Sequence, residues 1–252
     1  MNLSDILIRA YKTNQEIPVL SAKYPDLGTE TAYSVQKAYV EQRLKEDKIA
    51  GYKVGATSEA LQKRFGLDAP VAGVLLASGM KTGSPVIEIS AFKRLVIETE
   101  IGFLVGKPIT ALLENVSELQ ECIRGVLPAI ELPDLGFEDM ENLKGFDIIA
   151  ANVSAVQFIA GRERSFTGQE LKEVSVSLTL DGEVISVGKG SDAMGNPWNS
   201  LMWTVNKTLA QGWKIEPGQI IITGALGQVI PGKEGKYVAD YGELGEISFE
   251  IM

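Results

Sequence analysis

The stretch Arg94-Leu-Val-Ile-Glu-Thr-Glu-Ile-Gly-Phe-Leu-Val105 is an apolar run interrupted by two acids. Its length and its content of Val, Ile, Leu and Phe are typical of a buried strand. Glu98 and Glu100 are separated by one residue, so a strand directs both side chains to the same face. Two such carboxylates among apolar residues repel each other and lose their water, and the pair needs a proton or a cation. The stretch therefore predicts a divalent-metal site, unless one face of the strand is solvated.

A third acid occurs in a second apolar stretch, Gly125-Val-Leu-Pro-Ala-Ile-Glu-Leu-Pro-Asp134. Glu131 lies near the end of this predicted strand. A third carboxylate can complete a facial set of oxygen ligands with the first two and leave positions on the ion open for substrate or water. The alternative is a strand-end acid that faces solvent.

The chain of 252 residues contains no histidine and one cysteine. The absence of histidine excludes Ser-His-Asp, Cys-His and imidazole-metal mechanisms. Cys122 has apolar neighbours at helical spacing, which favours a packed thiol over a nucleophile. Any metal site must then be built from carboxylates and other oxygens, and this ligand set suits Mg²⁺ or Mn²⁺ better than Zn²⁺ or copper.

The net charge of −9 and the isoelectric point near 4.8 argue against a nucleic-acid partner, because phosphate binding requires clustered Lys and Arg. No run approaches the roughly 18 to 20 apolar residues that a membrane span requires. The first apolar segment contains Asp5. We therefore expect a cytoplasmic protein with no membrane association, and a single cysteine agrees with that compartment.

Lys53 lies in a short predicted strand, with glycines at positions 51 and 55. Glycines allow backbone or ligand to approach closely, and a lysine among them can pair with an anionic substrate or transfer a proton. The alternative is a solvated strand lysine.

The remaining pattern predicts a chain with more strand than helix and no regular alternation of the two. We expect one domain over residues 1–252, in which residues 1–48 form a helical N-terminal cap. Helices are predicted over 4–12, 30–46, 59–65, 116–125 and 197–211, with Ser58 as a cap. Strands are predicted over 70–76, 86–89, 174–180, 183–187, 219–226, 236–241 and 245–251, with a hairpin turn at Asp181-Gly182, and residues 146–161 are assigned to the β-rich half. Residues 188–195 fit neither nucleotide-binding glycine motif, so a nucleotide site is rejected.

Several motifs together resemble the fumarylacetoacetate hydrolase superfamily, and within it the group of 2-keto-4-pentenoate hydratases and 4-oxalocrotonate decarboxylases. The resemblance extends over most of the chain. It rests on Gly51-Tyr-Lys-Val-Gly-Ala-Thr-Ser58, residues 66–75, Glu98-Thr-Glu100, Ala129-Ile-Glu131, Asp147-Ile-Ile-Ala-Ala-Asn152, Gly195-Asn-Pro197, Gly212-Trp213, residues 217–226 and Ala239-Asp-Tyr-Gly-Glu-Leu-Gly245.

This resemblance implies an α+β fold, a mixed β-roll similar to the C-terminal domain of that superfamily, and a homo-oligomer. It implies that Mg²⁺ or Mn²⁺ is held by Glu98, Glu100 and Glu131, and that Lys53 is catalytic and contacts the substrate. It also implies substrate contacts from Asn152, Ser154 and Thr223, with a small 2-oxo acid as the substrate.

The implied activity is that of a metal-dependent lyase, first the hydration of 2-hydroxypenta-2,4-dienoate to 4-hydroxy-2-oxopentanoate in aromatic-compound catabolism. The alternatives are decarboxylation of 4-oxalocrotonate, hydrolysis of an acylpyruvate, and a non-catalytic member of the family. Two residues depart from the hydratase pattern, since Val71 and Ala151 stand where many hydratases carry acids. The distal group of the substrate, the number of subunits and the native metal are left open by the sequence.

Overall fold

A computed structural model describes residues 2–165 and 170–252. The helices are α1 (Leu3–Lys12), α2 (Thr29–Arg43), α3 (Glu59–Phe65), α4 (Val116–Cys122), α5 (Gly145–Ala150) and α6 (Pro197–Ala210). The strands are β1 (Ile49–Gly55), β2 (Val71–Leu76), β3 (Met80–Thr82), β4 (Val86–Ile87), β5 (Val96–Val105), β6 (Ile123–Leu132), β7 (Gln157–Ala160), β8 (Ser175–Leu180), β9 (Glu183–Lys189), β10 (Ile220–Ile222), β11 (Ile230–Pro231), β12 (Gly235–Asp240) and β13 (Glu246–Ile251).

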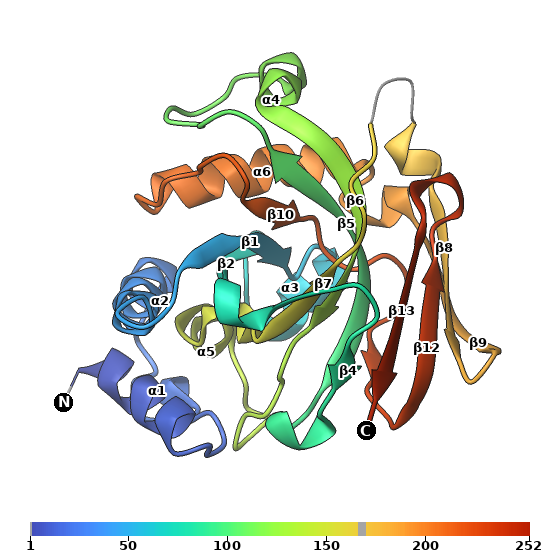
Figure 1. The fold of residues 1–252 in the computed structure, drawn as a ribbon. Helices are drawn as coiled ribbons and strands as arrows, with labels where there is room; N and C mark the ends of the chain where they lie inside the picture. Colours follow the sequence, from blue (N-terminus) through green and yellow to red (C-terminus); the bar gives the residue numbers. More distant parts are fainter. Residues whose placement is uncertain (1, 166–169) are drawn as a thin grey trace.

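Over the described residues these strands form two sheets (Figure 1). The eight-stranded sheet has the order β2-β1-β10-β5-β6-β7-β3, with β11 beside β5, and contains both parallel and antiparallel pairs. The five-stranded sheet has the order β4-β13-β12-β8-β9 and lies beside the long curved strands β5 and β6. The predicted α+β fold with a mixed sheet is confirmed.

The predicted buried strand around residues 94–105 is the centre of the larger sheet. Along β5 every residue except Glu98 is buried. Strand β6 pairs with β5 antiparallel and places Glu131 opposite Glu98. On its other side β5 pairs with β10, and β10 pairs in parallel with β1, which carries Lys53. Lys53 and the three glutamates therefore lie on strands of one sheet.

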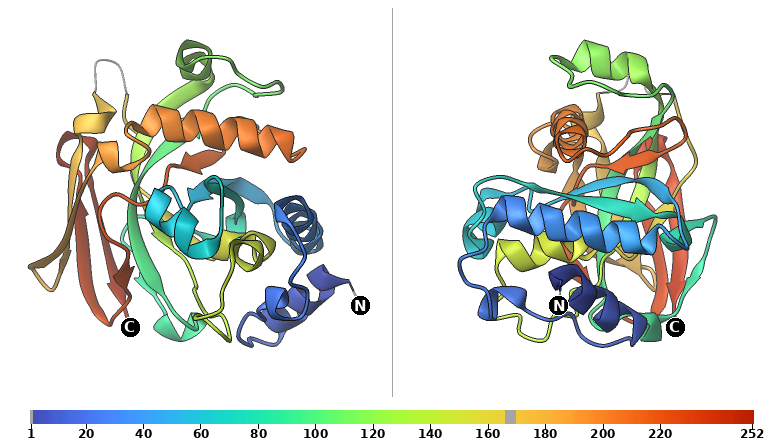
Figure 2. Two further views of the ribbon diagram at one scale, coloured as in Figure 1. Left: turned by 180° about the vertical axis from the view of Figure 1, so that it is seen from behind. Right: turned by 90° about the vertical axis from the view of Figure 1, so that its left-hand side faces the viewer.

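Helix α6 lies across the sheet beside β1 and β10 (Figure 2). The side chain of Asn196 caps its first turn by accepting a hydrogen bond from the Trp198 N–H, and Pro197 occupies the first turn, where a missing N–H costs nothing. The buried face contains Leu201 and Val205, and the rings of Trp198 and Phe103 lie 4.7 Å apart. This packing covers the strands that carry the candidate site.

Helices α1 and α2 lie on the opposite side from the smaller sheet and contact α5 through α2 (Figure 1). The buried amide of Gln36 donates to the carbonyls of Ala72 in β2 and Ile149 in α5. The buried carboxylate of Asp147 accepts from the Ser21 N–H and hydroxyl and from the Lys144 N–H, at 2.6–3.1 Å. Buried polar groups thus connect the N-terminal segment to α5.

The assignment of residues 146–161 to the β-rich half is wrong for most of that segment. Residues 145–150 form α5, a short turn follows, and only Gln157–Ala160 form a strand. All residues of α5 are buried, so the segment lacks the alternation between apolar and polar faces that identifies a surface helix. Residues 219–226 also form less strand than predicted, since β10 ends at Ile222. The cap at Ser58 and the hairpin at Asp181-Gly182 are confirmed.

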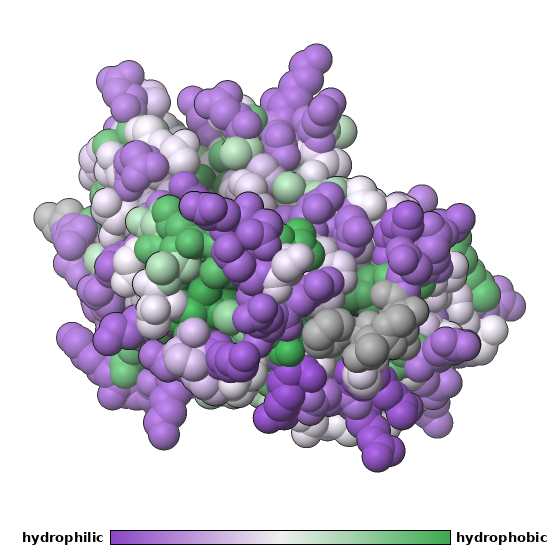
Figure 3. Space-filling model, turned by 90° about the horizontal axis from the view of Figure 1, so that it is seen from above, coloured by the Kyte–Doolittle hydropathy of each residue, from purple (hydrophilic) through white to green (hydrophobic). Residues whose placement is uncertain are grey.

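Polar and charged residues cover most of the surface in Figure 3, with smaller apolar areas between them. Among the described residues, none of the helices has the length and apolar character that crossing a membrane would require.

The network at Asp147 gives a prediction about stability. The substitution Asp147→Ala leaves two buried donors of Ser21 and the part-buried N–H of Lys144 without an acceptor, and we expect it to lower the free energy of unfolding by about 2–3 kcal/mol. Asp139 provides a matched control, because it also accepts three hydrogen bonds but does so at the surface, where water can replace it. Urea unfolding should show a loss below about 1 kcal/mol for Asp139→Ala. Equal losses in both variants would contradict this account.

Candidate active site

Three glutamates converge at the centre of the larger sheet. Glu98 and Glu100 project from one face of β5, and Glu131 comes from the neighbouring strand β6, directly opposite Glu98. One carboxylate oxygen from each residue lies within 4.8 Å of the others. Glu100 and Glu131 are fully buried, and Glu98 is half-buried. The alternative of two solvated acids is therefore not realised.

The pKa values of these acids reflect their confinement. Burial, reinforced by the charge of Glu131, raises the pKa of Glu98 to about 7. Burial and then the charges of its two neighbours raise the pKa of Glu100 well above its usual value. Burial also raises the pKa of Glu131, although Lys53 opposes the shift. The site thus favours protons or a cation over three free negative charges.

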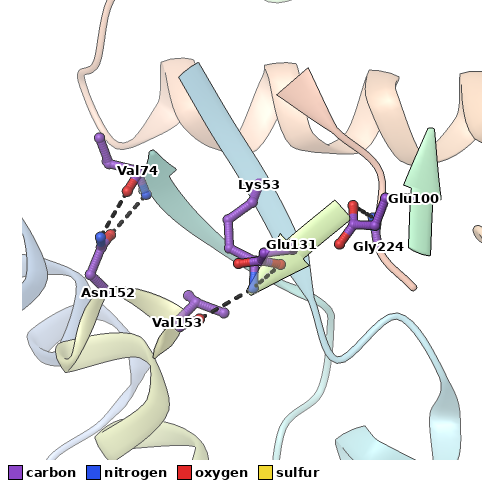
Figure 4. Close-up of polar contacts among 7 residues, drawn as sticks. All are labelled: Lys53, Val74, Glu100, Glu131, Asn152, Val153 and Gly224. Carbon is purple, nitrogen blue, oxygen red and sulfur yellow. Dashed lines mark hydrogen bonds and ion pairs between the residues drawn. The ribbon is translucent and has the colours of Figure 1, made fainter. Parts of the chain in front are cut away.

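Lys53 is the buried cation beside these acids (Figure 4). Its Nζ lies 2.8 Å from Glu131 Oε2 and donates a hydrogen bond of 3.2 Å to the carbonyl of Val153. Burial alone would lower the pKa of Lys53, but the three carboxylates outweigh burial and raise it. Lys53 is therefore an ammonium group held at the edge of the carboxylate cluster.

The carboxylates have the free oxygens that a cation requires. Glu100 Oε1 and Glu131 Oε1 are buried and have no hydrogen-bond partner among the described residues, whereas Glu100 Oε2 accepts from the Gly224 N–H at 2.6 Å. Buried oxygens without partners are costly, and a bound cation would remove that cost. Carboxylate oxygens alone form the donor set, which fits Mg²⁺ or Mn²⁺.

A left-handed turn positions the carbonyl that contacts Lys53. Asn152, Val153 and Ser154 all have positive φ, between 53° and 56°. This conformation is unfavourable for residues with a side chain, and most of all for the β-branched Val153. The turn is fixed on both sides, because the Asn152 side chain exchanges two hydrogen bonds of 2.8 Å with the Val74 backbone and the Ser154 carbonyl accepts from the Asp134 N–H. No glycine marks this turn, so sequence reasoning missed it.

The three candidate substrate contacts lie close to the site but differ in how they are engaged. Asn152 is buried and holds β2, as described above. The hydroxyl of Thr223 donates to the Ile101 carbonyl at 3.0 Å. Ser154 is buried, and its hydroxyl has no hydrogen-bond partner among the described residues. Of the three side chains, only that of Ser154 makes no hydrogen bond within the described residues, so its hydroxyl is available to a ligand.

The two departures from the hydratase pattern lie in different surroundings, Val71 on the side of Lys53 and Ala151 in a separate cavity. Gly55 has no side chain, and the space that its Cβ would occupy lies between Lys53 and two valines. A Cβ at that point would be 3.8 Å from Lys53 Nζ, 3.6 Å from a methyl of Val71 and 2.7 Å from a methyl of Val153. The surroundings of the ammonium on this side are therefore apolar. Ala151 and Ser154 also line a cavity of about 360 Å³ between the N-terminal helices and the turn, a cavity whose lining includes neither Lys53 nor any of the three glutamates.

The chain is similar to known proteins over most of its length. A 2-keto-4-pentenoate hydratase of Paraburkholderia phymatum is 30% identical over 244 residues, which cover 96% of this chain and 93% of the relative. A 4-oxalocrotonate decarboxylase of a Pseudomonas species is 28% identical over 223 residues, covering 86% of this chain and 82% of the relative. The structure of 4-oxalocrotonate decarboxylase from Pseudomonas putida complexed with magnesium and adipate superimposes with a TM-score of 0.91 at 26% identity, covering 99% of this chain and 96% of that chain.

The family model for the fumarylacetoacetate (FAA) hydrolase C-terminal region matches residues 53–252, which contain Lys53 and all three glutamates. The resemblance inferred from the sequence motifs is confirmed. The chain belongs to the fumarylacetoacetate hydrolase family.

Proposed function

We propose that this protein is a metal-dependent lyase that acts on a small 2-hydroxydienoate or 2-oxo acid, with hydration of 2-hydroxypenta-2,4-dienoate as its first candidate reaction. The observation that carries the proposal is the buried cluster of three carboxylates with an ammonium group 2.8 Å from one of them. Relatives named as hydratases, 28–30% identical over nearly the full chain, support the reaction class.

Glu98, Glu100 and Glu131 would hold Mg²⁺ or Mn²⁺ through the oxygens that face one another. When bound, the cation supplies positive charge beside the carboxylate and 2-oxygen of the substrate, where negative charge develops in a dienolate. The Gly224 N–H fixes one oxygen of Glu100 and leaves the other free for the cation.

Lys53 would transfer the proton that converts the dienolate to the keto acid. Its raised pKa keeps the amine protonated near neutral pH, so it can act as a general acid at Nζ. The Val153 carbonyl directs the ammonium, and the buried surroundings exclude water that would otherwise exchange the proton. Ser154, whose hydroxyl is free, would contact the substrate.

Decarboxylation of 4-oxalocrotonate is a second candidate reaction, and Val71 favours it. Addition of water at the distal carbons requires groups that handle additional protons, whereas loss of CO₂ from those carbons does not. The apolar side chain of Val71 near Lys53 supplies no such group.

Ultraviolet assays of the Mg²⁺-loaded protein with both substrates distinguish hydration from decarboxylation. If neither substrate is turned over, the result favours a non-catalytic member of the family.

Metal binding can be tested with Glu100→Gln. The amide oxygen can still accept from Gly224, but the negative charge is lost, so we expect Mg²⁺ affinity to fall by more than about tenfold. The exposed Glu88 provides a control, and Glu88→Gln should bind as the wild type does. Isothermal titration calorimetry measures both affinities. An unchanged affinity in Glu100→Gln would refute its assignment as a ligand.

The raised pKa values predict that Mg²⁺ binding depends on pH. Below about pH 7 Glu98 carries a proton in the metal-free protein, and the ion must displace it. The affinity should therefore rise by about tenfold per pH unit between pH 5.5 and 6.5 for each proton released. Calorimetry in buffers of different ionisation enthalpy measures the protons released. An affinity independent of pH over this range would contradict the prediction.

The role of Lys53 can be tested with Lys53→Met, which preserves volume and removes the proton. Ketonisation of 2-hydroxypenta-2,4-dienoate should slow by about 10² to 10⁴-fold, the usual contribution of a general acid or base. Mg²⁺ should still bind, because all three carboxylates remain. The exposed Lys45 gives the control Lys45→Met, which should react at the wild-type rate. Wild-type turnover in Lys53→Met would exclude the proposed role.

A further inference from the structure

A tyrosine from the smaller sheet reaches the two strands that carry the glutamates. Tyr241 follows the last residue of β12, and its side chain is buried with 1% exposure. Its hydroxyl accepts a hydrogen bond from the Glu100 N–H at 3.2 Å and donates one to the Ala129 carbonyl at 2.5 Å. These two backbone groups belong to residues that face each other across β5 and β6.

The hydroxyl of Tyr241 lies where the backbones of β5 and β6 face each other beside the glutamates. In an antiparallel pair, every second pair of facing residues exchanges N–H···O=C bonds, and these bonds set the spacing between the strands. Here one phenol hydroxyl bridges the donor on β5 and the acceptor on β6. Glu100 is itself a candidate ligand, and Ala129 precedes Glu131 by two residues on the same face of β6. The position of Tyr241 therefore bears on the separation of the carboxylates.

The backbone around Tyr241 is fixed independently of the metal site. Its N–H donates to the Gly245 carbonyl at 2.9 Å across a tight turn that contains Gly242 and Gly245, both with positive φ. A rigid turn in one sheet thus presents a hydroxyl to a ladder in the other.

We propose that Tyr241 is a positioning residue that sets the distance between β5 and β6 at the metal ligands, and thereby tunes metal affinity. The inference rests on the proposed metal site. It goes beyond that proposal by assigning a role to the smaller sheet, which contributes none of the three carboxylates. Without the hydroxyl, the strands must either approach or leave two buried backbone groups unpaired, and both outcomes disturb the ligand geometry.

Tyr237, which lies within β12, offers a matched control. It is equally buried, and its hydroxyl also makes two backbone hydrogen bonds, but both are to Lys233 in a loop that carries none of the three glutamates. Tyr241→Phe and Tyr237→Phe each remove one hydroxyl that makes two backbone hydrogen bonds, buried at Tyr241 and part-buried at Tyr237. The comparison therefore separates a general loss of stability from an effect on the ligands.

The test is calorimetric titration of Mg²⁺ into the wild type and both variants, together with the rise in melting temperature that Mg²⁺ produces in each. Tyr241→Phe should bind Mg²⁺ about 10- to 100-fold more weakly, the usual effect of losing a group that orients a metal ligand. Tyr237→Phe should bind within about twofold of the wild type. The rise in melting temperature at a fixed Mg²⁺ concentration should shrink only in Tyr241→Phe.

Equal affinities in the two variants would overturn the role of Tyr241 and leave the metal site intact. Failure of the wild type to bind Mg²⁺ would instead refute the proposed function on which the inference rests. If Tyr241→Phe does not fold, NMR of the wild type decides the matter. A cross peak between the Tyr241 hydroxyl proton and the Glu100 amide proton supports the bridge, and its absence in a spectrum that shows the Tyr237 hydroxyl overturns it.

Discussion

Three carboxylates lie close together in a buried site and repel one another, and the structure around the site must compensate for that repulsion. Glu98, Glu100 and Glu131 share one small volume, and one ammonium group, that of Lys53, lies beside them. When all three acids are ionised, the cluster carries a net charge of about −2 in an environment with little water, which is unfavourable without further compensation. The raised pKa values of the three acids express this cost.

The fold holds the acids together despite that cost. Glu98 and Glu131 are register partners in the longest ladder of the larger sheet, so their separation is set by backbone hydrogen bonds and not by the side chains. Gly224 follows β10 with φ of 89° and gives its N–H to Glu100, a geometry that favours glycine. The strained turn at Val153 fixes Lys53 in the same way. The ladder, the Gly224 N–H and the turn at Val153 each hold one of these charged side chains in place against the repulsion.

Much of this site could be predicted from the sequence because its signal is local. Two acids separated by one residue in an apolar strand must share a face, and the lack of histidine restricts the ligand chemistry to oxygen. The pairing of Glu98 with Glu131 required the register of two strands, which the sequence pattern does not give. The second apolar stretch already indicates Glu131 as a possible third ligand, and the family resemblance implies the same assignment.

Other features could not be predicted because their cause is tertiary. The buried helix α5 shows no amphipathic pattern, so its apolar residues were assigned to the β-rich half. The left-handed turn contains no glycine, and its conformation depends on hydrogen bonds from Val74 and Asp134, distant in sequence. Asn152 and Thr223 stay predicted substrate contacts, and the structure adds that their side chains bond to backbone carbonyls or amides. The hydrogen-bond partner of a buried polar side chain depends on which elements pack against it, and a single sequence does not show that packing.

A crystal structure of the protein with Mg²⁺ and oxalate tests the central claim most directly. We expect one cation with an oxygen of Glu98, Glu100 and Glu131 each within about 2.2 Å, and oxalate bound at its remaining positions. Lys53 should remain within hydrogen-bonding distance of the oxalate or of Glu131. Strong density for Mg²⁺ at another place, with the three glutamates bonded only to protons and to Lys53, would contradict the account.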